Sequence, residues 1–223
     1  MADTTEILGW YGDEIRRDGE GVARIWGGNV FSESNQPEWA DGVWVTRPGW
    51  VEAEDGEPTS PVDPTVSFRT FAAAGRAELD AAVVRLGGLA GGSGGRVVFW
   101  PSAASAMSDI PSVRAVANGW GADDPFGLLV DPGALLIPAM LREADEHLRR
   151  MAEELVPLGR VWAVRITDVV EDGEGLRAVP VGEGRLPLDA MCSVAAAARA
   201  ADRPVVLLAE GGIDEQARRL GLA

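Results

Sequence analysis

The sequence contains no lysine, since all 20 of its basic residues are arginine. This absence excludes enzymes that form a Schiff base or hold pyridoxal phosphate on a lysine, and it excludes phosphate loops of the Walker type. The chain has one histidine, His147, and one cysteine, Cys192. A mechanism with two histidines, an internal disulfide and a metal site of several cysteines are therefore excluded as well.

Positive charge is scarce, because 35 acidic residues stand against 20 basic ones and give a net charge of −15. A field of this sign repels phosphate groups, so we expect no nucleic-acid partner and no membrane partner. No apolar run approaches the roughly 18 residues of a membrane-spanning helix, and the first residues lack the pattern of a signal peptide. We expect a cytoplasmic protein with a single domain over residues 1–223.

Short apolar runs in the second half of the chain predict strands that are buried on both faces, as in a parallel sheet. These runs are 96–101, 126–131, 161–167 and 204–209. Helical patterns precede or separate them at 68–89, 137–156, 188–201 and 214–220. The alternation of strand and helix favours an α/β fold whose functional site lies at the carboxyl ends of the strands.

The first half of the chain is less regular. Segments 6–11, 22–26 and 43–46 predict strands, and the acidic, proline-rich segment at about 47–66 predicts an irregular loop. The glycine-rich segment 91–95 precedes a strand and does not join a strand to a helix. We interpret it as a flexible connector and not as a nucleotide-binding loop.

Three segments of the second half carry signatures in a recognisable order. They are Leu129–Gly133, Val164–Asp168, and the stretch 181–188 that leads to a strand ending at Glu210. Together they resemble the xylose-isomerase-like TIM barrels, a superfamily of sugar isomerases, epimerases and endonuclease-IV-like proteins. The resemblance implies an α/β barrel of the TIM type. Because a full barrel of this type needs about 250 residues, we expect a barrel that is reduced or incomplete in its N-terminal half.

The resemblance also implies four ligands to a divalent cation (Mn²⁺, Mg²⁺ or Zn²⁺) at the barrel mouth. Asp131 and Glu210 retain two of these four positions, whereas the first glutamate position falls near Trp100. A further histidine of the family signature, shortly after the aspartate, falls on Ala134. The ligand histidine of the next strand falls on Arg165, a permanent cation that repels a metal. We therefore assign no cofactor from the residues themselves, while the resemblance leaves a divalent metal as an alternative. An arginine beside the retained carboxylates would satisfy their charge as the ion did.

Six residues are candidates for the site. If the protein is an enzyme, we expect Glu210 as general base, Asp131 as polar anchor and Arg165 as the group that holds a negative or developing charge. A buried structural counter-ion is the alternative role for Arg165. The candidates for ligand binding, each with a structural alternative as core residue, cap or turn former, are Trp26, Trp100 and Asp168.

The resulting hypothesis is a sugar isomerase- or epimerase-like barrel with an altered or lost metal site that acts on or binds a small carbohydrate-like molecule. The alternative is a non-catalytic small-molecule binding or interaction protein on the same scaffold. An endonuclease-IV-like repair enzyme is disfavoured by the charge and the missing histidines. An incomplete sheet edge would pair with a second copy, so a homodimer is an expected assembly. His147 is expected on an outer helix face, and Cys192 is expected as a buried, inert thiol.

Overall fold

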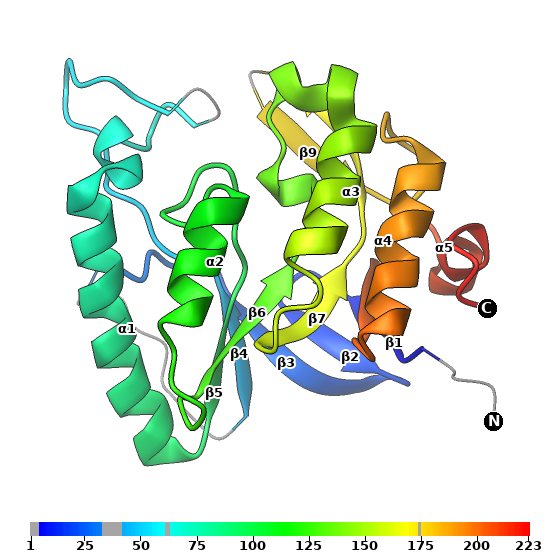
Figure 1. Ribbon diagram of the computed structural model, residues 1–223, viewed down its shortest axis with the longest axis horizontal. Helices are drawn as coiled ribbons and strands as arrows, with labels where there is room; N and C mark the ends of the chain where they lie inside the picture. Colours follow the sequence, from blue (N-terminus) through cyan, green and yellow to red (C-terminus); the bar gives the residue numbers. More distant parts are fainter. Residues whose placement is uncertain (1–4, 33–41, 61–62, 174) are drawn as a thin grey trace.

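The computed structural model describes residues 5–32, 42–60, 63–173 and 175–223, and its main feature is a closed barrel of eight strands (Figure 1). The barrel strands are β1 (Ile7–Trp10), β2 (Glu14–Arg17), β3 (Glu20–Trp26), β4 (Val43–Thr46), β5 (Arg96–Phe99), β6 (Phe126–Val130), β7 (Val161–Arg165) and β10 (Val205–Leu208). Their order around the barrel is β1-β10-β7-β6-β5-β4-β3-β2. Neighbouring strands pair in parallel, except that β2 is antiparallel to both β1 and β3.

Helices cover the part of the barrel that the second half of the chain builds. They are α1 (Ala73–Ser93), α2 (Ile110–Asn118), α3 (Ala144–Glu154), α4 (Leu188–Ala200) and α5 (Ile213–Arg219), with short 3-10 helices η1 (Phe68–Phe71), η2 (Gly133–Leu135) and η3 (Pro138–Glu143). Figure 1 shows α1 to α4 side by side along one side of the barrel. The strands and helices expected in this half are present, so the predicted TIM-type α/β barrel is confirmed.

The N-terminal half differs from the predicted reduction. The barrel closes with a full ring of strands, and what is missing is helix: among the described residues, no helix precedes η1. Every described barrel strand has a neighbour on both sides, so the expected open edge, at which a second copy would pair, is absent from the described barrel. The homodimer itself remains a prediction.

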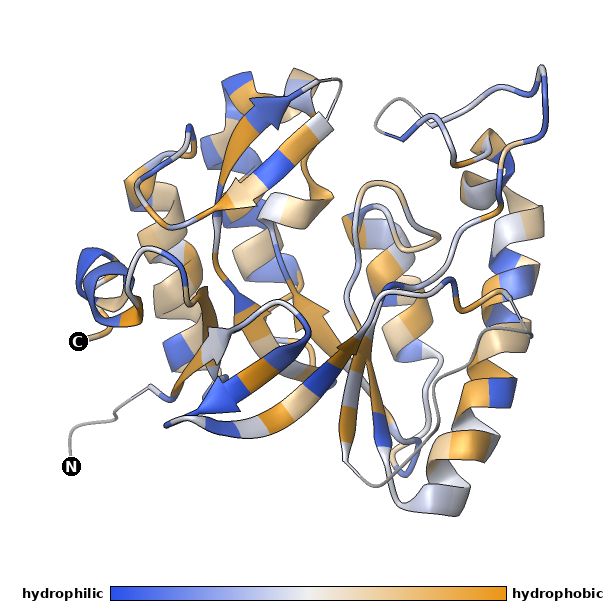
Figure 2. Ribbon diagram, turned by 180° about the vertical axis from the view of Figure 1, so that it is seen from behind, coloured by the Kyte–Doolittle hydropathy of each residue, from blue (hydrophilic) through white to orange (hydrophobic). Residues whose placement is uncertain are grey.

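Strands β2 and β3 need no covering helix because their residues alternate in polarity. Ile15 and Ala23 are buried inside the barrel, whereas Glu14, Arg16 and Arg24 lie on the other face. Figure 2 shows hydrophilic and hydrophobic residues alternating along these strands. A sheet with one solvated face is stable when pairing is antiparallel, which is how β2 joins its neighbours.

Two hydrophobic clusters hold the barrel. The inner one fills its interior with Leu8, Ile15, Ala23, Val45, Val98, Leu129, Ala163 and Val206. The outer one joins the barrel to the helices through residues such as Val97, Leu128, Leu207, Leu79, Leu148 and Val194. The strands of the second half contribute to both clusters, which explains their continuous apolar runs.

Helix α1 continues through most of the segment 91–95 that was expected to be a flexible connector. It ends at Gly94, which adopts the left-handed conformation (φ 72°) and donates its N–H to the carbonyl of Ala90. Glycine pays no steric cost at this position, so the glycine-rich segment is a helix end and not a linker. Helix α2 was missed, although Asp109 and Ser112 form a capping box at its start.

Two glycines of α1 provide a matched test of its packing. A Cβ at Gly75 would lie 2.1 Å from the carbonyl oxygen of Thr70, whereas a Cβ at Gly91 would meet nothing within 4 Å. We expect Gly75→Ala to lower the free energy of unfolding by about 2 kcal/mol or more. Gly91→Ala should raise it by about 0.5–1 kcal/mol, because alanine favours the helix. Urea denaturation checks both, and equal effects of the two variants would contradict this packing.

The described residues of the 47–66 segment, 47–60 and 63–66, form no helix and no strand, as expected. The side-chain amide of Asn29 donates to the carbonyl of Trp50 (2.7 Å) and accepts from its N–H (3.2 Å). Isolated bridges join Glu52 to Val66 and Thr59 to Ser67. Within the described ranges, no helix is long and apolar enough to cross a membrane.

Candidate functional site

The carboxyl ends of β5, β6 and β7 bring three predicted residues together. Arg165 Nη1 donates to Asp131 Oδ2 at 2.5 Å, and the side chains of the two residues are 5% and 0% exposed. Trp100 Nε1 donates to the same oxygen at 3.2 Å, and the N–H of Ala134 donates to Oδ1 at 3.2 Å. Both oxygens of this buried carboxylate are therefore satisfied, as a buried charge requires.

The register of β7 explains why an arginine lies inside the barrel. Ala163 belongs to the inner cluster, and Arg165, two residues later, faces the same side. Its guanidinium carbon lies 4.3 Å from the ring centroid of Trp10 and 4.9 Å from that of Trp100. The two indoles meet edge to face at 5.0 Å. Aromatic faces and one carboxylate thus replace water around this cation.

A cavity of about 300 Å³ opens onto this pair. Its polar and aromatic lining comprises Arg47, Asp63, Trp100, Ser102, Asp131 and Arg165. The antiparallel hairpin of β8 (Asp168–Asp172) and β9 (Gly175–Val179) supplies a further part of the wall, and Figure 1 shows it at the same end of the molecule as the 47–66 segment. The site therefore lies where α/β barrels place their functional groups.

Arg47 follows β4 and lies at the rim of the cavity. Its guanidinium carbon is 5.3 Å from the ring centroid of Trp100, and the residue keeps access to solvent. The surrounding mouth removes the guanidinium in part from water, which lowers its pKa, and the positive charge of Arg165 acts in the same direction. The carboxylate of Asp63 partly opposes this effect on the pKa. Arginine stays charged in proteins, so Arg47 keeps its positive charge at the cavity.

Glu210 was expected beside Asp131 and Arg165, and the structure does not place it there. It is exposed and does not line the cavity. Strand β10 ends at Leu208, and the chain then turns through Gly211 and Gly212, both with positive φ (76° and 77°). Side chains alternate between the two faces only within the strand, so the pattern that would direct Glu210 toward the interior ends at Leu208.

Trp26 also lies elsewhere. It packs against the outer cluster, whereas Trp100 packs against the inner one, so the expectation that both indoles share the mouth was wrong. Its predecessor Ile25 packs inside the barrel, and successive residues of a strand point to opposite faces.

Asp168 is buried, and its carboxylate holds the turn that precedes α4. Oδ1 accepts the N–H groups of Val169 and Leu186, both at 2.8 Å. Oδ2 accepts those of Gly182 (3.2 Å) and Gly184 (2.9 Å). A Cβ at Gly184 would lie 2.4 Å from Asp168 Oδ1, so only glycine permits this approach. The structure thus supports the turn-forming alternative for Asp168 over ligand binding.

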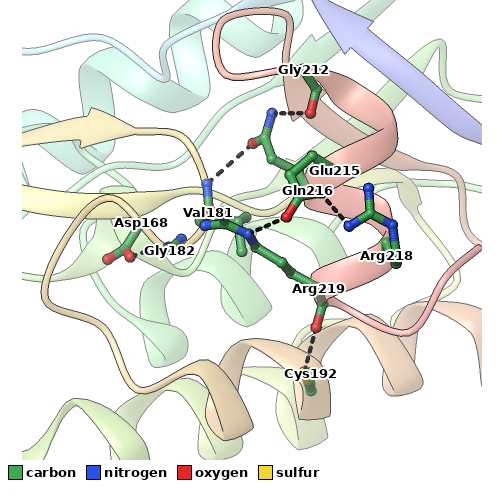
Figure 3. Close-up of polar contacts among 9 residues, drawn as sticks. All are labelled: Asp168, Val181, Gly182, Cys192, Gly212, Glu215, Gln216, Arg218 and Arg219. Atoms are coloured by element: carbon green, nitrogen blue, oxygen red, sulfur yellow. Dashed lines mark hydrogen bonds and ion pairs between the residues drawn. The ribbon is translucent and has the colours of Figure 1, made fainter.

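Helix α5 clamps the same turn from the other side (Figure 3). Gln216 Oε1 accepts the N–H of Val181 at 3.2 Å, and Arg219 Nη1 donates to the carbonyl of Val181 at 2.9 Å. Gln216 Nε2 also donates to the carbonyls of Leu208 and Glu210. The segment 181–188, which carried part of the family resemblance, is therefore a turn held in place by Asp168 and by helix α5.

The remaining single residues lie away from the cavity. His147 lies on α3, the helix expected there, is half-buried, and does not line the cavity. Cys192 on α4 is half-buried and not fully buried, and its Sγ lies 3.5 Å from the carbonyl of Arg219. Burial raises the pKa of its thiol, and the carboxylate of Asp189 adds to this effect, so the reactive thiolate is disfavoured.

The residues of the mouth do not fit a divalent cation. The described part of the chain contains no group of three or more His, Cys, Asp or Glu side chains able to hold a metal ion. Arg165 donates to the carboxylate that the resemblance assigns to the metal, and Glu210 does not reach the cavity. The positive charge beside Asp131 in this structure is that of the Arg165 guanidinium.

Sequence reasoning missed Trp10, Arg47, Asp63 and Ser102. The signal for the first two was available, because Trp10 is the last residue but one of the predicted strand 6–11 and Arg47 directly follows the predicted strand 43–46. Asp63 lies in the irregular segment, and only the folded chain shows that this segment reaches the mouth.

No protein-family model matches this sequence, and no curated protein matches it. Solved structures do match. The probable 3-DHS dehydratase from Bacillus anthracis is 11% identical, with 81% of this chain and 62% of that chain covered and a TM-score of 0.50. A xylose isomerase-like TIM barrel protein from Mycobacterium smegmatis, in complex with magnesium, is 13% identical (81% and 60% covered, TM-score 0.47). The 3-keto-D-glucoside 4-epimerase from E. coli is 18% identical (80% and 62% covered, TM-score 0.48).

These matches concern the fold of the chain. The chain spans about three fifths of the length of each of these structures. At 11% identity, the likeness to the dehydratase shows the fold alone, a TIM-type barrel as the sequence resemblance implied.

Proposed function

We propose that this protein is a sugar isomerase- or epimerase-like TIM barrel whose divalent-metal site has been replaced by the Asp131–Arg165 ion pair, and that it binds a small carbohydrate-like molecule at the barrel mouth. The observation that supports the proposal is the buried ion pair, which joins two residues at positions where the resemblance implies metal ligands. Trp100 donates to Asp131 of the same pair and lines the cavity, so its indole is the group on which we expect a sugar face to stack.

Binding is supported better than turnover. Asp131 is held by three donors, and Glu210, the residue first assigned as general base, does not line the cavity. A general base must lie within hydrogen-bond reach of the proton that it removes. The non-catalytic binding protein is therefore the second candidate that the geometry favours.

The proposal predicts that divalent metals do not stabilise the fold. We expect the same Tm in EDTA and in Mn²⁺ or Mg²⁺, because the proposed protein has lost its metal site. A metal that bound at 100 times its Kd would instead add about 2.7 kcal/mol of stability. The measurement is thermal unfolding, with NaCl at equal ionic strength as the control for the screening of the acidic surface. A rise in Tm that is specific to Mn²⁺ or Mg²⁺ and is reversed by EDTA would contradict the loss of the metal site.

The carbohydrate part is tested with a panel of aldoses and ketoses. Each sugar is incubated with the protein, and NMR follows the formation of isomers or epimers while thermal unfolding reports binding. Turnover supports the enzymatic form of the proposal, and stabilisation without turnover supports the binding form. If no sugar is converted and none raises the Tm, both forms are wrong.

A further inference from the structure

Two residues that line the mouth cavity carry buried hydrogen-bond donors with no partner among the described residues. Arg165 donates through Nη1 to Asp131, but its Nε is buried and has no partner among the described residues. The hydroxyl of Ser102 is likewise buried without a partner. Both residues line the cavity. A buried donor without a partner costs about 1–3 kcal/mol, so a ligand that satisfies it is favoured.

Arg47 adds a second cation to the same cavity. Within the described ranges its guanidinium forms no hydrogen bond or ion pair, and its contact is with the ring of Trp100. Arg165 lies against the ring of the same tryptophan, so two guanidinium groups converge on one indole. A planar fork of N–H donors is the arrangement that binds carboxylate and phosphate oxygens.

The acceptors that line the cavity are largely engaged. Asp131 accepts three hydrogen bonds, and Asp63 Oδ1 accepts the N–H (2.9 Å) and hydroxyl (2.6 Å) of Thr65. The cavity therefore offers more free donors than free acceptors. This local excess of donors occurs in a protein whose net charge is −15, so it does not follow from the overall composition.

We infer that the mouth cavity binds a small organic anion, a carboxylate or a phosphate ester, whose oxygens accept hydrogen bonds from Arg47, Ser102 and Arg165 while its ring or chain lies against Trp100. The volume of about 300 Å³ equals that of about ten water molecules, which suits an acid sugar of one ring. The sugar part of this inference rests on the proposed function, whereas the anionic part rests on the free donors.

The test compares charged and neutral sugars of the same ring size. Isothermal titration of the full chain is carried out with D-glucuronate, D-glucose 6-phosphate and D-glucose. We expect at least one of the two anions to bind about tenfold or more tightly than D-glucose. The preferred anion identifies carboxylate or phosphate as the recognised group.

Two arginine variants locate the binding. Arg47→Gln should weaken the preferred anion about tenfold or more, because a charge-assisted hydrogen bond is lost. The matched control is Arg24→Gln, since Arg24 is also an exposed arginine over a tryptophan, 5.6 Å from the ring centroid of Trp44, but does not line the cavity. It should bind the anion as the wild type does. Ser102→Ala, which removes the buried hydroxyl, should weaken binding as well.

Three results would overturn the inference: neither anion binds at millimolar concentration, D-glucose binds as tightly as the anions, or Arg47→Gln binds the anion as the wild type does. Binding of D-glucose alone would leave the proposed sugar function standing. Binding of an anion by a protein that neither converts nor binds any neutral sugar would support the inference and count against the proposed function.

Discussion

Replacing Arg165 by leucine is expected to lower the free energy of unfolding by about 3–5 kcal/mol. Asp131 would stay fully buried with no cation beside it, and the N–H groups of Trp100 and Ala134 would be its remaining partners. The measurement is urea denaturation followed by tryptophan fluorescence. In a marginally stable domain this loss is a large share of the total stability.

Two controls separate the buried pair from ordinary charge removal. Arg177 pairs with Asp172 on the β8–β9 hairpin at 3.3 Å, with both side chains more than half exposed, so Arg177→Leu should change stability by less than about 1 kcal/mol. The double variant Asp131→Leu, Arg165→Leu removes both charges and should recover much of the loss. The prediction is wrong if Arg165→Leu costs no more than Arg177→Leu.

The second large effect is expected at Asp168. Asp168→Asn keeps the shape of the side chain, but an NH₂ group replaces one of the two carboxylate oxygens. In either orientation of the amide this NH₂ group would face two backbone N–H donors. They are those of Gly182 and Gly184 in one orientation and those of Val169 and Leu186 in the other. Hydrogen bonds to a charged group contribute about 1.5–3 kcal/mol each. With two of them replaced by a contact between donors, we expect a loss of about 3 kcal/mol or more in the free energy of unfolding.

The same measurement on Asp172→Asn provides the control, because Asp172 lies on the same hairpin and is exposed. Its substitution should have an effect below about 1 kcal/mol. If Asp168→Asn is as stable as this control, the carboxylate does not hold the turn and its earlier assignment to ligand binding regains support.

The strands of the second half could be predicted because each is apolar on both faces, a pattern that few other structures produce. Strand β2 could not be predicted in this way. Glu14–Arg17 is short and mainly charged, and it is a strand because β1 and β3 supply hydrogen-bond partners on either side. The hairpin β8–β9 was missed for a related reason, since its pairing depends on a turn and not on an apolar run.

The site was predicted in part. Asp131, Arg165 and Trp100 end or follow strands at one edge of the barrel, and the folded chain brings all three together. The predicted positions of Glu210 and Trp26 at the mouth were wrong for local reasons. Strand β10 ends before Glu210, and Trp26 lies on the outward side of β3. A shift of one residue at a strand end moves a side chain to the opposite face, and spacing along the sequence does not reveal that shift.

The amino-acid sequence by itself determined which chemistries this protein lacks, where its parallel strands lie, and that an arginine, Arg165, stands within an apolar strand run. These are properties of residue type and of periodicity along the chain, so they are readable without coordinates. Only the tertiary structure decided that Asp168 holds a turn, that Glu210 leaves the mouth, and that Arg47 and Ser102 join Arg165 around one cavity. Those outcomes depend on register and loop paths that bring distant segments together, and such contacts exist only once the barrel has closed.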